Sequence, residues 1–290
     1  MTTPAPQAPY QPPQQAQAPQ NWQGAPGGLY NSPIPVRRAS LGDAIASEWT
    51  KIRSVRSTLW TLGVMIVLLL GIGLLSAIAV TASDADLGTT PVLSLGFFGV
   101  LLGSICVITL GVLTIASEYG TGMIRTTLTA CPSRARVLTA KAIVFFLLSF
   151  VITTVTTALV GMLQTAMVDG TEPSGDDWLR ATVGVGLYIA TLGLLSLALG
   201  ALIRHSAGAI TIMIAVVLLP LVLAMFMFSE TLADLQQALF EYSIPNQLGA
   251  FYDASVTTSG PSGWEPLWII LGVTAVAMGG AYLSLDRRDV

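Results

Sequence analysis

Six uncharged, apolar stretches dominate the hydropathy pattern of this chain. They are residues 59–80, 92–115, 142–168, 181–203, 209–228 and 267–285. A helix needs about 20 mostly apolar residues to cross a hydrocarbon core of about 30 Å. Lipid also requires each segment to satisfy its own backbone hydrogen bonds, which a helix does. The pattern therefore predicts an all-α membrane protein with six transmembrane helices over residues 59–290.

The residues before the first apolar stretch carry an amphipathic pattern. Apolar residues recur at three- and four-residue spacing at Leu41, Ile45, Trp49, Ile52 and Val55, which draws a stripe along a helix. Ser40 and Asp43 stand three residues apart, near the pattern of a capping box. We expect an interfacial helix over residues 39–58, with its cations towards lipid headgroups. Two roles are open for this helix: it anchors the first span and does nothing more, or it also contacts a cytoplasmic partner.

Residues 116–141 read ASEYGTGMIRTTLTACPSRARVLTAK and lie between the second and third stretches. Gly120 and Gly122 favour a turn, and Tyr119, Met123, Ile124 and Leu128 fit one side of a short helix. Pro132 would end that helix, and Ser133 can cap the next one. We expect the first turns of the third span, with Arg134, Arg136 and Lys141, to protrude from the membrane. A short helix joined so stiffly to two spans would act as a lever; the alternative is a merely basic loop.

The long loop over residues 229–266 has a weaker pattern. Leu232, Leu235 and Leu239 are spaced for a short amphipathic helix, and the run IPNQLGAFYD follows. Spacing alone predicts only a surface helix there.

Composition supports a membrane protein with a separate tail. The chain is 53% hydrophobic and 10% charged, whereas soluble domains are about a quarter charged. Residues 1–36 contain no charge but nine of the sixteen prolines and seven glutamines, so they cannot bury enough apolar area to fold. We expect a disordered tail over residues 1–38. The two cysteines, Cys106 and Cys131, suggest no disulfide framework.

Charge segregation predicts the orientation. With six spans, 12 of the 13 basic residues fall on the side of both termini, and only Arg180 falls on the other. The acidic residues divide as five and eleven, which gives net charges of +7 and −10. Because Lys and Arg are retained on the cytoplasmic side, we expect both termini in the cytoplasm of a cell whose plasma membrane the chain crosses.

The spans contain no Asp, Glu, Lys or Arg. A charge at the bilayer centre costs about 2.5–3.5 kcal/mol or more and usually marks an ion pathway, so an ion-coupled carrier is disfavoured. The spans offer hydroxyls, soft apolar side chains and a proline that would bend the fifth helix. Helix packing explains each of these residues alone, but as a set they suit a path for a hydrophobic substrate. The candidate residues for that path are Ser104, Thr109, Met213, Pro220, Met225 and Phe226.

Nothing in the chain predicts catalysis. Neither Lys51 nor Lys141 has the glycine-rich context of a phosphate-binding loop. The one histidine, His205, stands beside Arg204 at a span end, and no metal-ligand motif occurs. We expect no catalytic residue, metal or cofactor in this chain, and no nucleic acid as a partner.

Three runs resemble the permease subunit of ABC-2 type ABC transporters in the style common in actinobacteria: SEWTKIRSVRSTLWTL, ASEYGTGMIRTTL and PSRARVLTAKA. The resemblance covers residues 40–290 and implies a coupling helix that opens at Glu118 and seats in an ATPase subunit. Gly122, Pro132, Arg134 and Lys141 also match the family, although Met123 stands where the family often has Thr. By this resemblance the ATPase-contact candidates are Glu118, Tyr119, Gly122, Arg125, Pro132, Arg134 and Arg136, with Glu48, Lys51, Arg53 and Arg56 from a connecting helix.

The resemblance also implies a function. It predicts a bacterial exporter in which a partner ATPase binds ATP and Mg²⁺, and a second copy of this chain or a related permease completes the pore. Substrate would pass between the second and fifth spans of the two halves, and the loop over residues 229–266 would dip into the outer leaflet. Hydrophobic drugs, lipids, lipopeptides and antibiotics all fit, as does a role in resistance. The alternative is a membrane scaffold or sensor that uses this fold without transport.

Overall fold

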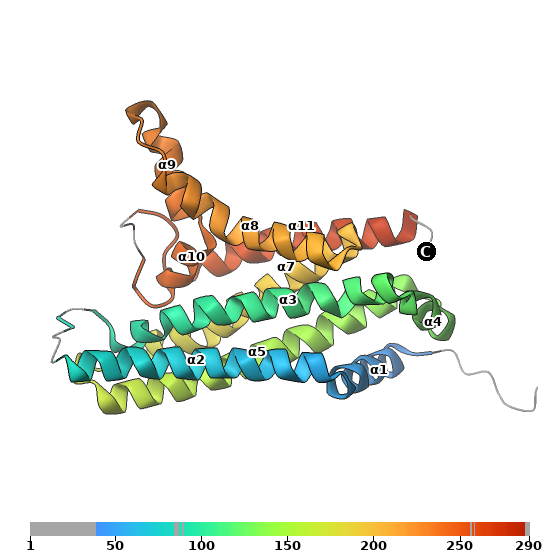
Figure 1. The fold of residues 1–290 in the computed structure, drawn as a ribbon, viewed down its shortest axis with the longest axis horizontal. Helices are drawn as coiled ribbons and strands as arrows, with labels where there is room; N and C mark the ends of the chain where they lie inside the picture. Colours follow the sequence, from blue (N-terminus) through green and yellow to red (C-terminus); the bar gives the residue numbers. More distant parts are fainter. Residues whose placement is uncertain (1–38, 84–86, 89, 256, 258, 288–290) are drawn as a thin grey trace, which may run out of the picture. The chain divides into compact units, whose positions relative to one another are not determined.

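The computed structural model describes residues 39–83, 87–88, 90–255, 257 and 259–287, and this part of the chain is helical with no strand. The tail predicted over residues 1–38 lies outside the described residues. Six helices are long and apolar enough to cross a membrane, which confirms the predicted number. They are α2 (Arg56–Ala82), η1 with α3 (Val92–Gly96, Phe97–Thr121), α5 (Arg134–Met167), α6 with η2 and α7 (Gly175–Leu179, Arg180–Gly184, Val185–Ile203), α8 (Ser206–Met225) and α11 (Glu265–Arg287) (Figure 1).

The helices extend beyond the apolar stretches at most ends. α5 starts at Arg134, as expected from Ser133 and well before the apolar stretch begins at residue 142, because the Ser133 side chain accepts a hydrogen bond from the Arg136 N–H and caps the helix there. The fifth span has the predicted length but lies three residues earlier in the chain, since α8 runs from Ser206 to Met225. Hydropathy reports contact with lipid, whereas caps decide where a helix begins and ends.

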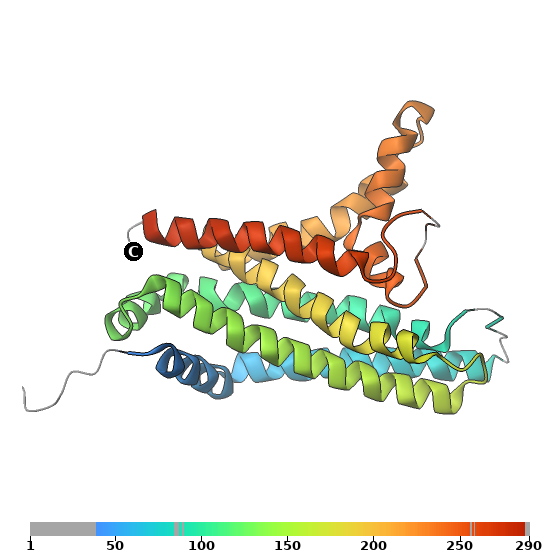
Figure 2. The same ribbon diagram turned by 180° about the vertical axis from the view of Figure 1, so that it is seen from behind.

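Helix α7 lies at the centre of the packing and contacts α3, α5, α8 and α11 (Figure 2). Tyr188, Leu192 and Leu197 on α7 are completely buried. The approach of α3 to α7 requires glycine: a Cβ atom on Gly111 would lie 2.5 Å from the Gly193 carbonyl oxygen. Small residues of this kind let membrane helices approach closely where no hydrophobic effect drives them together.

The fourth span is interrupted by a π-helical segment, η2. Arg180, at its first position, forms ion pairs with Asp176 at 2.8 Å and Asp177 at 2.7 Å on the preceding turn. Its guanidinium also binds both carboxylate oxygens of Asp253, at 2.8 and 2.9 Å. This contact ties the start of the span to the loop that follows α10.

The loop over residues 229–266 folds into η3 (Glu230–Leu232), α9 (Ala233–Glu241) and α10 (Ile244–Ala250). The predicted short helix is α9, on which Leu235 is exposed. All seven residues of α10 are buried, and it contacts α3, α8, α9 and α11. The Gln247 amide donates to the Tyr242 carbonyl oxygen at 2.8 Å, which satisfies one buried polar group.

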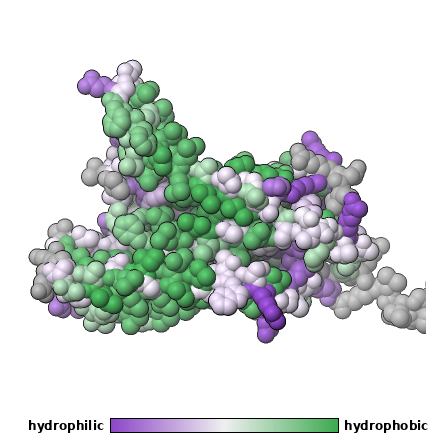
Figure 3. All heavy atoms as spheres, viewed as in Figure 1, coloured by the Kyte–Doolittle hydropathy of each residue, from purple (hydrophilic) through white to green (hydrophobic). Residues whose placement is uncertain are grey.

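The described chain begins and ends at the same end of the helix bundle. The Arg136 guanidinium donates to the Ala39 carbonyl oxygen, and the Arg134 guanidinium donates to the Leu285 carbonyl oxygen at 2.6 Å. The helices α1 (Leu41–Ser54) and α4 (Met123–Ala130) lie at this end (Figures 1 and 2). Apolar residues cover the middle of the face in Figure 3, and hydrophilic residues gather towards the end that carries α1 and α4.

Candidate functional site

Four charged side chains from three helices meet at the end of the bundle that carries α1 and α4. Glu48 and Lys51 come from α1, Glu118 from the last turn of α3, and Lys141 from α5. Lys51 Nζ lies 2.7 Å from Glu48 Oε1 and 2.8 Å from Glu118 Oε1. Lys141 Nζ lies 2.9 Å from Glu48 Oε2 and 2.6 Å from Glu118 Oε1. Each lysine thus binds both glutamates, and these four residues are hereafter the ion cluster.

The ion cluster is neutral and largely buried. Glu48 and Glu118 are each 5% exposed and Lys141 is 1% exposed, whereas 29% of the Lys51 side chain is exposed. A buried ion is tolerable only when it is paired and hydrogen-bonded. Burial alone would lower the pKa of Lys51, but its hydrogen bonds to Glu118 and Glu48 and their charges outweigh burial and raise that pKa above its ordinary value.

Local structure brings α1 to the cluster. Ser40 and Asp43 form the predicted capping box at the start of the helix. Glu48 and Lys51 are three residues apart and therefore share a face. Trp49 and Val55 of the predicted apolar stripe are 44% and 45% exposed, whereas the Lys51 ammonium group does not turn to the surface as expected. The charged pair faces inward instead, because α3 and α5 supply the opposite charges.

The segment over residues 116–141 is the predicted helix between two spans. α3 continues through Gly120 to Thr121, and the turn falls on Gly122 alone, whose φ of 73° favours glycine. Ile124 packs inward from α4 while Met123 stays exposed. One expectation was wrong: Lys141 does not protrude but is buried, because Glu48 and Glu118 enclose its ammonium group.

The structure separates the other predicted contact residues from the ion cluster. Arg53, Arg56 and Arg125 are exposed, as are Gly122 and Pro132.

Three further members of that set make internal contacts. Arg134 and Arg136 hold the Leu285 and Ala39 carbonyls. Tyr119 is half-buried, and the Arg204 guanidinium lies 4.8 Å from the centre of its ring. The structure is that of a single subunit and does not test contact with an ATPase, so the ATPase-contact roles of these residues stay predictions.

The six candidates for a substrate path do not share one environment. Ser104 and Met213 are buried, whereas Met225 and Phe226 are 58% and 73% exposed at the end of α8. The Thr109 hydroxyl donates to the Ile105 carbonyl of its own helix. Pro220 lies within α8, which continues through it.

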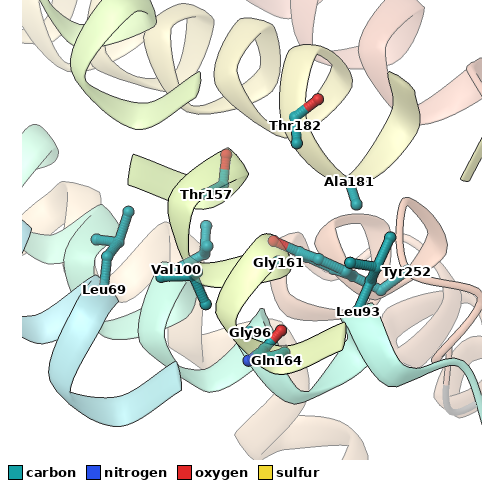
Figure 4. Close-up of a pocket in the computed structure, with 11 residues that line it drawn as sticks. Leu69, Leu93, Gly96, Val100, Thr157, Gly161, Gln164, Ala181, Thr182 and Tyr252 are labelled. Carbon is teal, nitrogen blue, oxygen red and sulfur yellow. The ribbon is translucent and has the colours of Figure 1, made fainter. Parts of the chain in front are cut away.

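Two cavities are relevant to ligand binding. The first is enclosed by α2, α3, α5, the start of the fourth span and Tyr252, with Thr157, Gln164 and Thr182 among its polar residues (Figure 4). Its volume of about 10 Å³ is at the lower limit for one water molecule, so no substrate fits. The second adjoins the ion cluster and has a volume of about 290 Å³.

The described residues contain no group of three or more His, Cys, Asp or Glu side chains placed to hold a metal ion.

Sequence reasoning named Glu48, Lys51 and Glu118 as contacts for a partner and did not foresee their contact with one another. Lys141 was matched only as a family residue. One signal could have found it: the chain has two lysines among thirteen basic residues, and each precedes an uncharged apolar stretch, Lys51 the first and Lys141 the third.

A family model matches most of the chain. The model of the family described as "ABC-2 family transporter protein" matches residues 48–290, which include the ion cluster and all six apolar helices from α2 to α11. A search among curated proteins found no match.

Proposed function

The chain belongs to the ABC-2 transporter family and is a multi-pass membrane protein, and on that premise we propose that it is the permease subunit of an ATP-driven exporter. Members of this family normally work with a separate ABC ATPase. In this proposal the ATPase binds ATP and Mg²⁺, and the present chain turns its movements into movements of the spans.

The observation that carries the proposal is the position of the ion cluster. α4 joins α3 to α5 through Gly122 on one side and residues 131–133 on the other. The cluster connects α1 to the same two spans through two contacts, Lys51 to Glu118 on α3 at 2.8 Å and Glu48 to Lys141 on α5 at 2.9 Å. A push on α1 or α4 would therefore reach α3 and α5 together rather than being absorbed by a flexible loop.

The distribution of charge supports a cytoplasmic position for this end. Arg53, Arg56 and Arg125 are exposed on α1, α2 and α4. At the opposite end the Arg180 guanidinium is surrounded by three aspartates. By the positive-inside rule, the end with α1 and α4 faces the cytoplasm, here that of a bacterial cell.

We assign different roles to the exposed and the buried members of the predicted contact set. Arg53, Arg56 and Arg125 are available to an acidic surface of the ATPase, and rim charges of this kind set association rate and orientation. The ion cluster lies beneath them and positions α1. Substitution in either group would impair coupling, but only the exposed arginines would change binding of the ATPase directly.

The second half of the exporter would be another copy of this chain or a related permease. Apolar side chains along α8, including Val216, Leu219 and Leu223, are 44–50% exposed and can face either lipid or a second subunit. A path lined by such residues suits a hydrophobic or amphipathic substrate.

The decisive experiment is purification of the tagged protein in mild detergent, followed by mass determination and an ATPase assay. We expect a nucleotide-hydrolysing subunit to copurify in equal amount, and the Arg53→Glu and Arg125→Glu variants to lose it. Arg287→Glu is the matched control, since it reverses an exposed arginine on α11 at the same end. A chain that repeatedly purifies alone, in detergent and in lipid, would overturn the proposal and favour a scaffold or sensor.

A further inference from the structure

The cavity of about 290 Å³ beside the ion cluster has two kinds of wall. One wall is apolar and consists of Leu110 and Leu113 on α3 with Phe145 and Leu148 on α5. The opposite end is formed by all four members of the ion cluster. Its volume is close to the lower limit of ordinary ligand pockets, which are mostly apolar with a few convergent polar groups.

The cavity opens beside the membrane spans. Val55, at the break between α1 and α2, and Met123, at the start of α4, line it and are 45% and 49% exposed. Ser57 and Thr58 from the first turn of α2 also line it. A molecule in the cavity would therefore have its polar end at a span terminus and its apolar end between the spans.

The hydrogen bonds within the ion cluster determine which chemical group the polar end of a bound molecule can carry. Lys141 Nζ uses its three N–H groups on Glu48, Glu118 and the Thr114 carbonyl oxygen. Lys51 Nζ uses its own on Glu48, Glu118 and, at 3.4 Å, the Thr127 hydroxyl. The lysines have no donor left for a phosphate or a carbonyl group.

The acceptors are in surplus. Two carboxylates offer about eight lone-pair sites, and the lysines fill four of them. Glu118 Oε2 has only the Thr127 hydroxyl, at the long distance of 3.5 Å. A ligand head that donates N–H hydrogen bonds and has no net charge of its own therefore complements the neutral cluster, and one without N–H groups does not.

We propose that this cavity binds a bilayer lipid whose headgroup carries a primary ammonium group, with the ammonium donating to Glu118 and an acyl chain along Leu113 and Leu148. A primary ammonium supplies three compact donors, and the apolar wall supplies the hydrophobic contact. This inference goes beyond the proposed function, because lipid occupancy requires neither the ATPase nor transport.

The test is photolabelling of the full chain in vesicles that contain a trace of diazirine-bearing phospholipid. Two probes share the same acyl chains: one has an ethanolamine head and the other a choline head, which has no N–H group. Labelled peptides are identified by mass spectrometry. We expect the ethanolamine probe to label peptides containing Leu113 or Leu148 about tenfold more than the choline probe, which corresponds to ~1.4 kcal/mol.

Two substitutions localise the signal without touching the ion cluster. Leu148→Trp fills the cavity and should abolish the headgroup preference. Leu147→Trp adds the same side chain at the next position, which is 53% exposed and outside the cavity lining, and should preserve it. Equal labelling by the two probes would overturn the proposal, as would a preference that survives Leu148→Trp. Neither failure would affect copurification of the ATPase, so the two proposals are tested separately.

Discussion

Substitution of Lys141 by Met tests whether the ion cluster behaves as one unit. It removes an ammonium group that contacts Glu48 at 2.9 Å and Glu118 at 2.6 Å. Two carboxylates would then share Lys51, and the buried site would carry a net charge of −1. Removal of one partner from a buried ion pair costs about 3–5 kcal/mol. Glu118→Gln should cost a similar amount, since it leaves a net charge of +1.

The double variant with Lys141→Met and Glu118→Gln separates charge balance from packing. It restores neutrality and leaves the pair of Lys51 and Glu48, which are 2.7 Å apart. We expect its destabilisation to fall short of the sum of the single variants by about 2–3 kcal/mol, a coupling typical of residues in one network. The measurement is thermal unfolding of each purified variant in the same lipid nanodiscs.

Acidification should distinguish the two single variants. In Lys141→Met the buried site holds one more carboxylate than ammonium groups, and burial favours the neutral form of an unpaired carboxyl group, so lowering the pH from 7.5 to 5 should relieve the excess negative charge. It cannot relieve the excess positive charge of Glu118→Gln. Arg180→Gln combined with Glu118→Gln is the control, since Arg180 lies at the other end of the bundle and separate sites should be additive. Additive destabilisation by Lys141→Met and Glu118→Gln, or equal responses to acid, would refute the cluster as a coupled unit.

Two further predictions concern a lysine and a glycine. The raised pKa of Lys51 keeps its amine protonated. An amine-acylating reagent at pH 8 should therefore modify Lys51 more slowly than a lysine introduced by Arg53→Lys, and modification of Lys51 should increase as the pH rises through its pKa. Equal modification rates, measured by mass spectrometry, would contradict the pairing of Lys51 with the two glutamates. Gly111→Ala should lower the unfolding temperature, at a cost of about 1–3 kcal/mol, because its Cβ would meet the Gly193 carbonyl oxygen at 2.5 Å. Gly272→Ala, with nothing within 4 Å, should have little effect, and the argument fails if the two variants unfold alike.

Hydropathy and capping chemistry were sufficient to predict the number of spans and two of the helix starts. Charge-free stretches gave the number of spans because a bilayer excludes unpaired charge. Ser40 and Ser133 marked two helix starts because a hydroxyl can satisfy N–H groups in the first turn, and both caps form. These signals are local and need no knowledge of the packing.

The ion cluster could not be predicted in the same way. Its contacts join residues 67 and 93 positions apart in the chain, and only helix packing determines which charges meet. Glu48 falls on the apolar stripe between Ile45 and Ile52, because each residue of a helix advances by about 100°; that position indicates a buried face but does not identify the partners. The burial of α10 escaped for a different reason: Asn246 and Gln247 are polar, and their amides donate to the Glu241 and Tyr242 backbone carbonyls, which no side-chain pattern reports.

The π-helical segment η2 fixes the rotational register of the fourth span. A π turn holds an extra residue compared with an α turn, and each residue of an α-helix advances by about 100°. The residues of α6 are therefore turned relative to the register that α7 would have imposed on them. The residues that share one face of this span are therefore offset by one position before and after residues 180–184. A one-residue deletion within residues 180–184 would remove that offset. The contact between Arg180 and Asp253 depends on that single extra residue as much as on its own chemistry.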